Sequence, residues 1–274
     1  MAYAINADGS VIGGWTMDNG GLSACLWRNG VPASLGTLPG LPGFQQPTVY
    51  GLSSDGSIAA GTASTGGIDR AFRWSAPGGM QDLGTLAGWT SSAADAISGD
   101  GLVIVGGPQR AFRWTDQEGM HDLGVLAGTT LSRALAVNVD GTVIVGTSGE
   151  RACMWSAATG LVDLNQYLPA IGINLKGWVL EAATGISSDG LTIVGHGRHN
   201  GAFEAWRAVL RPDCYANCDG STVAPALNVA DFICFINRFA GGDPRANCDG
   251  STTTPMLNPS DFTCFAASFS AGCP

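Results

Sequence analysis

The chain has 274 residues, of which 13% are charged and 41 are glycine, and its formal net charge is −9. Few charges and many glycines indicate short elements that are buried on both faces and joined by tight turns. The scarcity of Lys and Arg argues against nucleic acid as a partner, because neutralising phosphates requires clustered basic side chains. No apolar run reaches the ~18 residues of a membrane-spanning helix, so the sequence predicts no transmembrane segment.

An internal repeat occupies residues 1–211, in five copies of about 45 residues each. Every copy begins with a short segment that ends in Ile-Ser or a relative of it, followed by an Asp-Gly pair, a Val-Ile-Val-Gly-like segment, and then Ala-Phe-Arg-Trp or a relative of it. The Asp recurs at Asp8, Asp55, Asp100, Asp140 and Asp189, and the tryptophan at Trp27, Trp74, Trp114, Trp155 and Trp206. We interpret each copy as four short strands, with Asp-Gly forming a two-residue type I′ turn between the first two.

Four strands in a repeat of this length indicate a blade of a β-propeller, so residues 1–211 are expected to be all-β. A β-solenoid is the alternative, although its repeats are usually shorter. The fifth copy lacks the Met-x-Asp-Leu-Gly segment, which predicts an incomplete last blade. The array is therefore either a closed five-bladed ring with one short blade or part of a larger ring. In a partial ring, an open strand edge would favour self-association.

The motifs A-x-x-I-S-x-D-G-x-x-I-V-G, A-F-R-W and G-M-x-D-L-G resemble the HAF-type extracellular repeat of bacterial surface and secreted proteins. The resemblance covers about residues 1–211. It implies a repeat architecture that is displayed outside the cell, and it implies no particular activity.

Aromatic residues occur in the loops that join the fourth strand of one copy to the next copy. They are Phe44, Trp89, Tyr167 and Trp178. These loops should open on one face of the propeller, where aromatic rings can stack on sugar rings. The alternative is that the rings pack between blades, because aromatic side chains bury a large area and usually find neighbours.

Two histidines and two cysteines stand out from the repeats. His196 and His199 lie in a polar stretch that we expect to be a loop, where they are either solvated or part of a metal or acid–base site. Cys25 and Cys153 occupy a position that is Phe in other copies, which predicts buried thiols. No catalytic constellation is evident, so a non-enzymatic protein is favoured and enzymatic activity stays open.

A second repeat fills residues 212–274, where Ala-Asn-Cys-Asp-Gly-Ser-Thr recurs after 30 residues. Apolar residues at helical spacing follow each Asp-Gly loop and predict two helices. The dense cysteines indicate a disulfide framework formed in an oxidising compartment. They are Cys214, Cys218, Cys234, Cys248, Cys264 and Cys273. The duplication favours Cys218–Cys234 and Cys248–Cys264, which leaves Cys214–Cys273 to join the ends.

This duplicated loop and helix resembles a dockerin, in particular the GC-type dockerin-like tail of planctomycete-like secreted proteins. Dockerin loops bind Ca²⁺ in the manner of an EF-hand. The resemblance assigns the ligands to Asn217, Asp219, Asn228, Asp231, Asn247, Asp249, Asn258 and Asp261. Extra residues interrupt each loop, and the first ligand position falls on Tyr215 or Arg245, which departs from the pattern. Asn228 and Asn258 are alternatively helix N-caps, with Asp231 and Asp261 favoured by the helix dipole.

We therefore expect a secreted, non-catalytic binding or structural protein at a cell surface or in an extracellular assembly. Its tail at 212–274 would dock to a protein, either cohesin-like or a surface anchor. The chain opens inside a repeat without a signal peptide, which we expect to be missing or removed. The alternatives are a glycan hydrolase or lyase that uses the propeller mouth and a self-assembling structural subunit.

Overall fold

The structure is a computed structural model that describes residues 1–18, 21–41, 43, 45–171, 173–210, 218, 228–243, 246, 248 and 257–271. The chain divides into two compact units. The first comprises Met1–Tyr167 and Leu175–Val209, and the second comprises Leu168–Asn174 and Leu210–Pro274. Within the part of the chain that the structure describes, no helix is long and apolar enough to cross a membrane.

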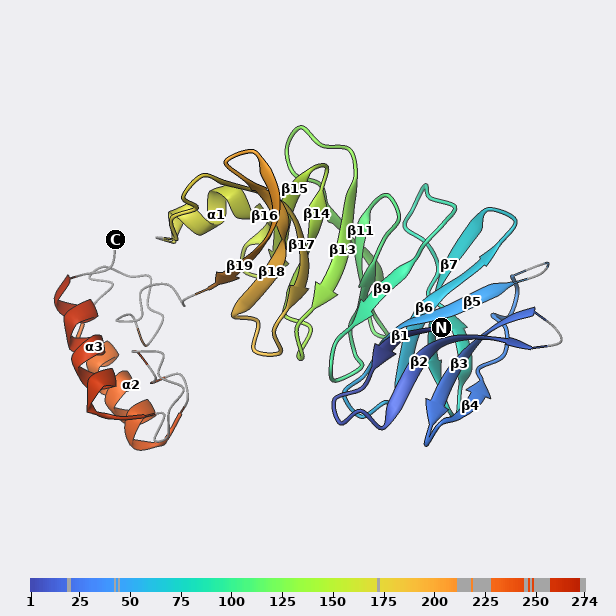
Figure 1. Ribbon diagram of the computed structural model, residues 1–274, viewed down its shortest axis with the longest axis horizontal. Coiled ribbons are helices and arrows are strands. Elements are labelled where there is room, and N and C mark those ends of the chain that lie inside the picture. Colours follow the sequence, from blue (N-terminus) through green and yellow to red (C-terminus); the bar gives the residue numbers. More distant parts are fainter. Residues whose placement is uncertain are drawn as a thin grey trace. The chain divides into compact units, whose positions relative to one another are not determined.

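Five antiparallel sheets make up the first unit, one for each repeat, so the predicted all-β, propeller-like array is confirmed (Figure 1). The first sheet holds β1 (Ala2–Ile5), β2 (Val11–Asp18), β3 (Gly21–Arg28) and β4 (Val31–Ser34), and the second holds β5 (Gln46–Leu52), β6 (Ile58–Thr65), β7 (Ile68–Ser75) and β8 (Gly79–Asp82). The third holds β9 (Ala94–Ile97), β10 (Ile104–Gly106), β11 (Ala111–Thr115) and β12 (Gly119–Gly124), and the fourth holds β13 (Ser132–Val137), β14 (Val143–Ser148), β15 (Arg151–Ser156) and β16 (Gly160–Asp163). Helix α1 (Leu164–Ala170) precedes the fifth sheet, whose strands are β17 (Trp178–Ile186), β18 (Thr192–His199) and β19 (Ala202–Val209). This last sheet has three strands, as the incomplete fifth repeat predicts.

The sheets pack face to face in chain order. The first strand of each sheet contacts the first strand of the next, so β1, β5, β9, β13 and β17 form the inner side of the array. Among the described residues, the first and fifth sheets share no comparable interface, and the five sheets therefore do not close into a ring.

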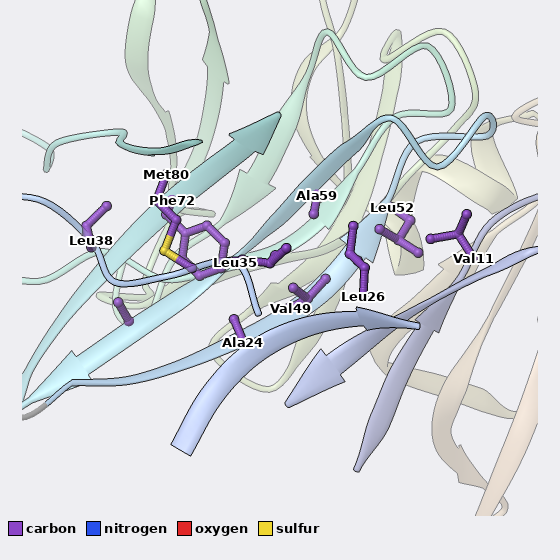
Figure 2. Close-up of a cluster of buried hydrophobic side chains, with 11 residues drawn as sticks. Val11, Ala24, Leu26, Leu35, Leu38, Val49, Leu52, Ala59, Phe72 and Met80 are labelled. Atoms are coloured by element: carbon purple, nitrogen blue, oxygen red, sulfur yellow. The ribbon is translucent and has the colours of Figure 1, made fainter. Parts of the chain in front are cut away.

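Figure 2 shows the core between the first and second sheets. It is formed by Val11, Ala24 and Leu26 of the first sheet, Val49, Leu52, Ala59, Phe72 and Met80 of the second, and Leu35 and Leu38 of the connecting loop. Full burial of one large aliphatic side chain contributes about 1.5–3 kcal/mol. Because a middle sheet buries residues on both faces in this way, few positions remain for charges, which explains the composition.

The Asp-Gly turns differ from the predicted type I′ turns. A type I′ turn needs positive φ at both central residues, but Asn29, Lys176 and Asn200 are the only non-glycine residues with positive φ in the described chain. Glycine alone is left-handed in these turns, as Gly56 is with φ of 67°. The aspartate instead accepts a backbone hydrogen bond two residues on, from Ser57 N–H to Asp55 at 2.9 Å, because a short carboxylate can close such a turn.

These turns also link the sheets to one another. A backbone N–H in one turn donates to a carbonyl in the next sheet's turn, and the donors and acceptors are Ala7 to Ser54 (3.1 Å), Ser54 to Gly99 (2.8 Å), Asp100 to Val139 (3.1 Å) and Val139 to Ser188 (3.2 Å). We call this series the turn belt. It joins all five sheets at the end where each first strand finishes.

The second unit contains two helices, α2 (Val229–Ala240) and α3 (Pro259–Ala271). Their equivalent side chains Phe235 and Phe265 are buried and stack with ring centroids 4.1 Å apart. Disulfides join Cys218 to Cys234 and Cys248 to Cys264, which are the two pairs that the duplication predicts. Cys214 and Cys273 lie outside the described residues, so the third pair stays a prediction.

Candidate functional site

Every first strand carries a bulge at the same place in the repeat. The residues that stand between paired neighbours there are Tyr3, Tyr50, Asp95, Leu135 and Thr184. Each lies five residues before the Asp of its Asp-Gly pair. A bulge takes one residue out of the strand ladder and re-aims its side chain. These five residues on the inner strands form what we call the bulge row.

A glycine in the second strand makes room for each bulge. A Cβ atom on Gly61 of β6 would lie 2.0 Å from the carbonyl oxygen of Thr48, and one on Gly106 of β10 would lie 2.1 Å from that of Ala93. No side chain fits so close to a backbone oxygen. The glycine of the Val-Ile-Val-Gly segment is therefore required by the same local structure that produces the bulge row.

Two aromatic rings begin the row. Tyr3 and Tyr50, from neighbouring sheets, have ring centroids 5.3 Å apart with an angle of 57° between the rings, and both side chains are partly exposed. Burial raises the pKa of Tyr50 above its ordinary value, and so do the charges that Tyr3 and Asp95 carry when they are ionised, against the opposing effects of Thr48 and Arg133. The Tyr50 hydroxyl therefore stays neutral near pH 7 and can both donate and accept a hydrogen bond.

An ion pair continues the row. Arg133 of β13 donates through Nε and Nη2 to the two carboxylate oxygens of Asp95 of β9, over 2.9 Å and 2.5 Å. Burial raises the pKa of Asp95, against the effect of the hydrogen bond and charge of Arg133. The Arg133 side chain is half-exposed, and this pair uses two of the five N–H groups of a guanidinium. The row, together with Arg133 paired to its Asp95, thus presents aromatic faces, a neutral hydroxyl and a charged donor.

Sequence reasoning missed the bulge row because it looked for aromatic residues in long loops. A signal was present at the position five residues before each Asp-Gly pair. The repeats agree on both sides of that position but carry Tyr, Tyr, Asp, Leu and Thr at it. Such variation inside a regular strand indicates a position that the fold does not constrain.

The structure gives partners to two of the predicted loop aromatics, of which Trp178 begins strand β17 and does not lie in a loop. Trp178 stacks on His199 with ring centroids 4.8 Å apart and an angle of 9°. Trp89 lines a small cavity with Pro108 and Gln109 of the next sheet. Tyr167 lies in α1 and is half-buried, while Phe44 lies outside the described residues. A sugar-binding role for these four residues stays a prediction.

The two histidines lie in strand β18 and not in the expected loop. The ring of His196 is 5.2 Å from that of Phe203, and His199 Nδ1 is 3.6 Å from a carboxylate oxygen of Glu204. In the described part of the chain, no three or more His, Cys, Asp or Glu side chains are grouped so as to hold a metal ion. These contacts join the histidines to aromatic and acidic neighbours.

Cys25 and Cys153 are buried free thiols, as predicted. Burial raises the pKa of Cys25 to about 11 and that of Cys153 to about 12. Because the thiolate is the reactive form of cysteine, both side chains are inert at neutral pH.

Four of the predicted calcium ligands lie at the N-termini of the two helices. Asn228 Oδ1 accepts from the Ala230 N–H at 2.7 Å, and Asp231 Oδ2 accepts from the Asn228 N–H at 2.9 Å. Asn258 and Asp261 repeat this capping box in the second copy. Asn217, Asp219, Asn247 and Asp249 lie outside the described residues, and Ca²⁺ binding stays a prediction.

Comparison with known proteins finds solved structures of low similarity. No protein-family model matches the sequence, and no curated protein matches it. TolB from Acinetobacter baumannii matches 76% of this chain with a TM-score of 0.49 and 15% identity, and the chain spans about half (51%) of that TolB. A putative TolB from Agrobacterium tumefaciens matches 77% of the chain and 74% of its own, with a TM-score of 0.45 and 14% identity. A nidogen/laminin complex matches 72% of the chain and 70% of its own, with a TM-score of 0.44 and 11% identity.

Proposed function

We propose that this protein is a non-catalytic binding protein of the extracellular space or the cell envelope, and that the bulge row binds a glycan. The bulge row carries this proposal. In a repeat array, residues that the fold needs recur in every copy, as the Asp-Gly pair and the tryptophan do. The bulge row does the opposite, because one shared backbone position presents five side chains of four different kinds.

The chemistry of the row suits a sugar. The partly exposed rings of Tyr3 and Tyr50 offer apolar faces to the C–H groups of a pyranose ring, which resembles the use of tyrosine in other binding surfaces. The neutral Tyr50 hydroxyl and the remaining N–H groups of Arg133 can bond to sugar hydroxyl groups. The Asp95–Arg133 pair holds the guanidinium in place, so less conformational freedom is lost when a ligand binds.

The tail is proposed to dock to a protein partner, with α2 as the contact face. Val229, Ile233 and Ile236 of α2 are exposed and fall on one side of the helix, at i, i+4 and i+7. The equivalent residues of α3 are Pro259, Thr263 and Ala266, which are smaller or polar. The two copies therefore differ on the exposed face of the helix, where α2 alone carries a strip of apolar residues outside the core. The two disulfides fit a location outside the cytoplasm.

The glycan proposal is tested on an array of immobilised neutral and acidic oligosaccharides. The chain should bind a subset of the array, and Tyr50→Ala and Arg133→Ala should each weaken that binding tenfold or more, as expected for removal of a central contact. Trp89→Ala is the matched control, because it removes an aromatic ring from a loop and leaves the row intact. Binding that survives Tyr50→Ala but is lost in Trp89→Ala would place the site in the loops instead.

The tail proposal has two separate tests. A calorimetric titration should show Ca²⁺ binding to the full chain, and the absence of heat together with unchanged melting after chelation would contradict it. The double substitution Ile233→Thr and Ile236→Ala gives α2 the outer face of α3 without touching the core. This variant should retain its melting temperature but no longer sediment together with isolated cell envelopes. Unchanged sedimentation with the envelopes would show that α2 does not form the docking surface.

A further inference from the structure

The outer face of the fifth sheet is exposed at positions that are buried in every other sheet. Val194 of β18 is 41% exposed, whereas its equivalents Ala60, Val105 and Val145 are exposed by only 0–1%. Those residues are covered by the sheet that follows. No described sheet covers Val194, so the last sheet presents the surface that each preceding sheet uses to contact its successor.

A second position shows the same contrast. Phe203 of β19 is 64% exposed, and its equivalents Ala24, Ala71, Ala111 and Ala152 are exposed by at most 2%. Ala205, the neighbour of Phe203 on this face, is exposed as well. Phenylalanine stands here where the other sheets have alanine, so this face offers a larger apolar area than the internal interfaces do.

The outer face of the first sheet is exposed at the matching positions. Ile5 of β1 is 62% exposed, whereas its equivalents Leu52 and Ile97 are 9% and 8% exposed because the preceding sheet covers them. An open pocket of about 500 Å³ lies beside it and is lined by Gly9, Ile12 and Trp27. This sheet therefore presents the surface that the other sheets use to contact their predecessors.

The internal interfaces show what would fill this pocket. A Cβ atom on Gly56, the equivalent of Gly9, would lie 2.7 Å from Val11 of the preceding sheet, and one on Gly141 would lie 2.3 Å from Val103. A β-branched residue thus covers this glycine in each case. The residue at the equivalent position of the fifth sheet is Thr192, which is β-branched and of valine's size.

The polar groups of the two outer faces match a polar contact of an internal interface. Between the first and second sheets, Arg28 Nη2 donates to the carbonyl oxygen of Gly56 at 2.8 Å. The equivalents of these two residues on the open faces are Arg207, which is exposed, and Gly9. The turn belt likewise runs from Ala7 to Ser188 and ends at these same two faces.

We propose that the outer face of the fifth sheet binds the outer face of the first sheet of a second copy of this chain. The interface continues the sheet-on-sheet packing of the array from one molecule to the next. Because two different surfaces meet, the association is head-to-tail, and it leaves one open face at each end of every assembly that does not close into a ring. The inference is independent of the glycan proposal, since neither face contains the bulge row.

Two single substitutions test whether the association is head-to-tail. Val194→Asp places a charge on the outer face of the fifth sheet, and Ile5→Asp places one on that of the first. Light scattering after size-exclusion chromatography should show the unchanged chain growing in mass with concentration, past a dimer. Each variant alone should stay monomeric. An equimolar mixture of the two should form a dimer and nothing larger, because each supplies the face that the other has lost.

Leu102→Asp is the matched control, since Leu102 is about as exposed as Ile5 but lies beside an Asp-Gly turn away from both faces. It should associate as the unchanged chain does. Ala205→Arg blocks the same face as Val194→Asp from the exposed strand β19, and it replaces that variant if circular dichroism shows a loss of fold. A chain that is monomeric at every concentration overturns the proposal. A single variant that still dimerises alone also overturns it, because like faces would then be meeting, and so does a mixture of two monomeric variants that forms no dimer.

Discussion

Replacing Gly61 with alanine should destabilise the propeller strongly. The new Cβ atom would lie 2.0 Å from the carbonyl oxygen of Thr48 and 2.8 Å from Phe72 Cζ, whereas real Cβ atoms essentially never come closer than 3.0 Å to another heavy atom. The inner strand must therefore move by about 1 Å or lose its bulge. Overpacking of this kind typically costs about 1–3 kcal/mol and occasionally more. Since backbone has to move here, we expect about 3 kcal/mol.

Urea denaturation followed by circular dichroism measures this cost. A loss of about 3 kcal/mol corresponds to a fall in melting temperature of about 6–12 °C for a domain of this size. Gly78→Ala is the control, because Gly78 lies in an exposed turn of the same sheet with only the Ser75 hydroxyl nearby. We expect that change to stay within about 0.5 kcal/mol. If Gly61→Ala costs no more than Gly78→Ala, the second-strand glycine does not make room for the bulge.

Three further predictions concern titrating groups. Arg133→Ala removes the partner of the largely buried Asp95 carboxylate and raises the pKa of Asp95 further. A raised carboxyl pKa favours the folded state at low pH. Urea denaturation should therefore show that this variant loses less stability between pH 7 and pH 4 than the unchanged chain does, and an equal or larger loss would contradict the pairing. Hydrogen bonds from Ser53 and Ser57 lower the pKa of Asp55 to about 2. The contribution of Asp55 to stability is therefore present above about pH 4 and is lost as the pH falls towards 2. Asp55→Asn should weaken this dependence of stability on pH, and an unchanged pH profile of stability would contradict the prediction. Cys25 and Cys153 should resist iodoacetamide in the native chain at pH 8 and react after unfolding, and rapid native labelling seen by mass spectrometry would show that they are not buried.

The architecture could be predicted because the sequence repeats it. A period of about 45 residues with four strand-like segments indicates a propeller blade, and each copy supports the interpretation of the others. The three strands of the last sheet could be predicted for the same reason, because the fifth repeat lacks the segment that forms the fourth strand. The two disulfides followed from the duplication of the tail, because residues related by a 30-residue shift have equivalent partners.

The features that were missed depend on the backbone and not on residue type. Asp-Gly is compatible with several turns, and the sequence does not reveal that Asp55 accepts a backbone hydrogen bond with its own φ negative. His196 and His199 were expected in a loop because polar residues are common there, yet β18 extends through them. The bulge row was missed because a bulge is a shift in pairing between two strands, which only the paired structure shows.

We propose that the bulge row, and not Trp89 or Trp178, binds the ligand. Hydroxyl-radical footprinting distinguishes these two sites, with an oligosaccharide that binds on the array and mass spectrometry to read the oxidised side chains. We expect the oligosaccharide to protect Tyr3 and Tyr50 and to leave the oxidation of Trp89 and Trp178 unchanged. Protection of Trp89 and Trp178 with Tyr3 and Tyr50 still fully oxidised would contradict it.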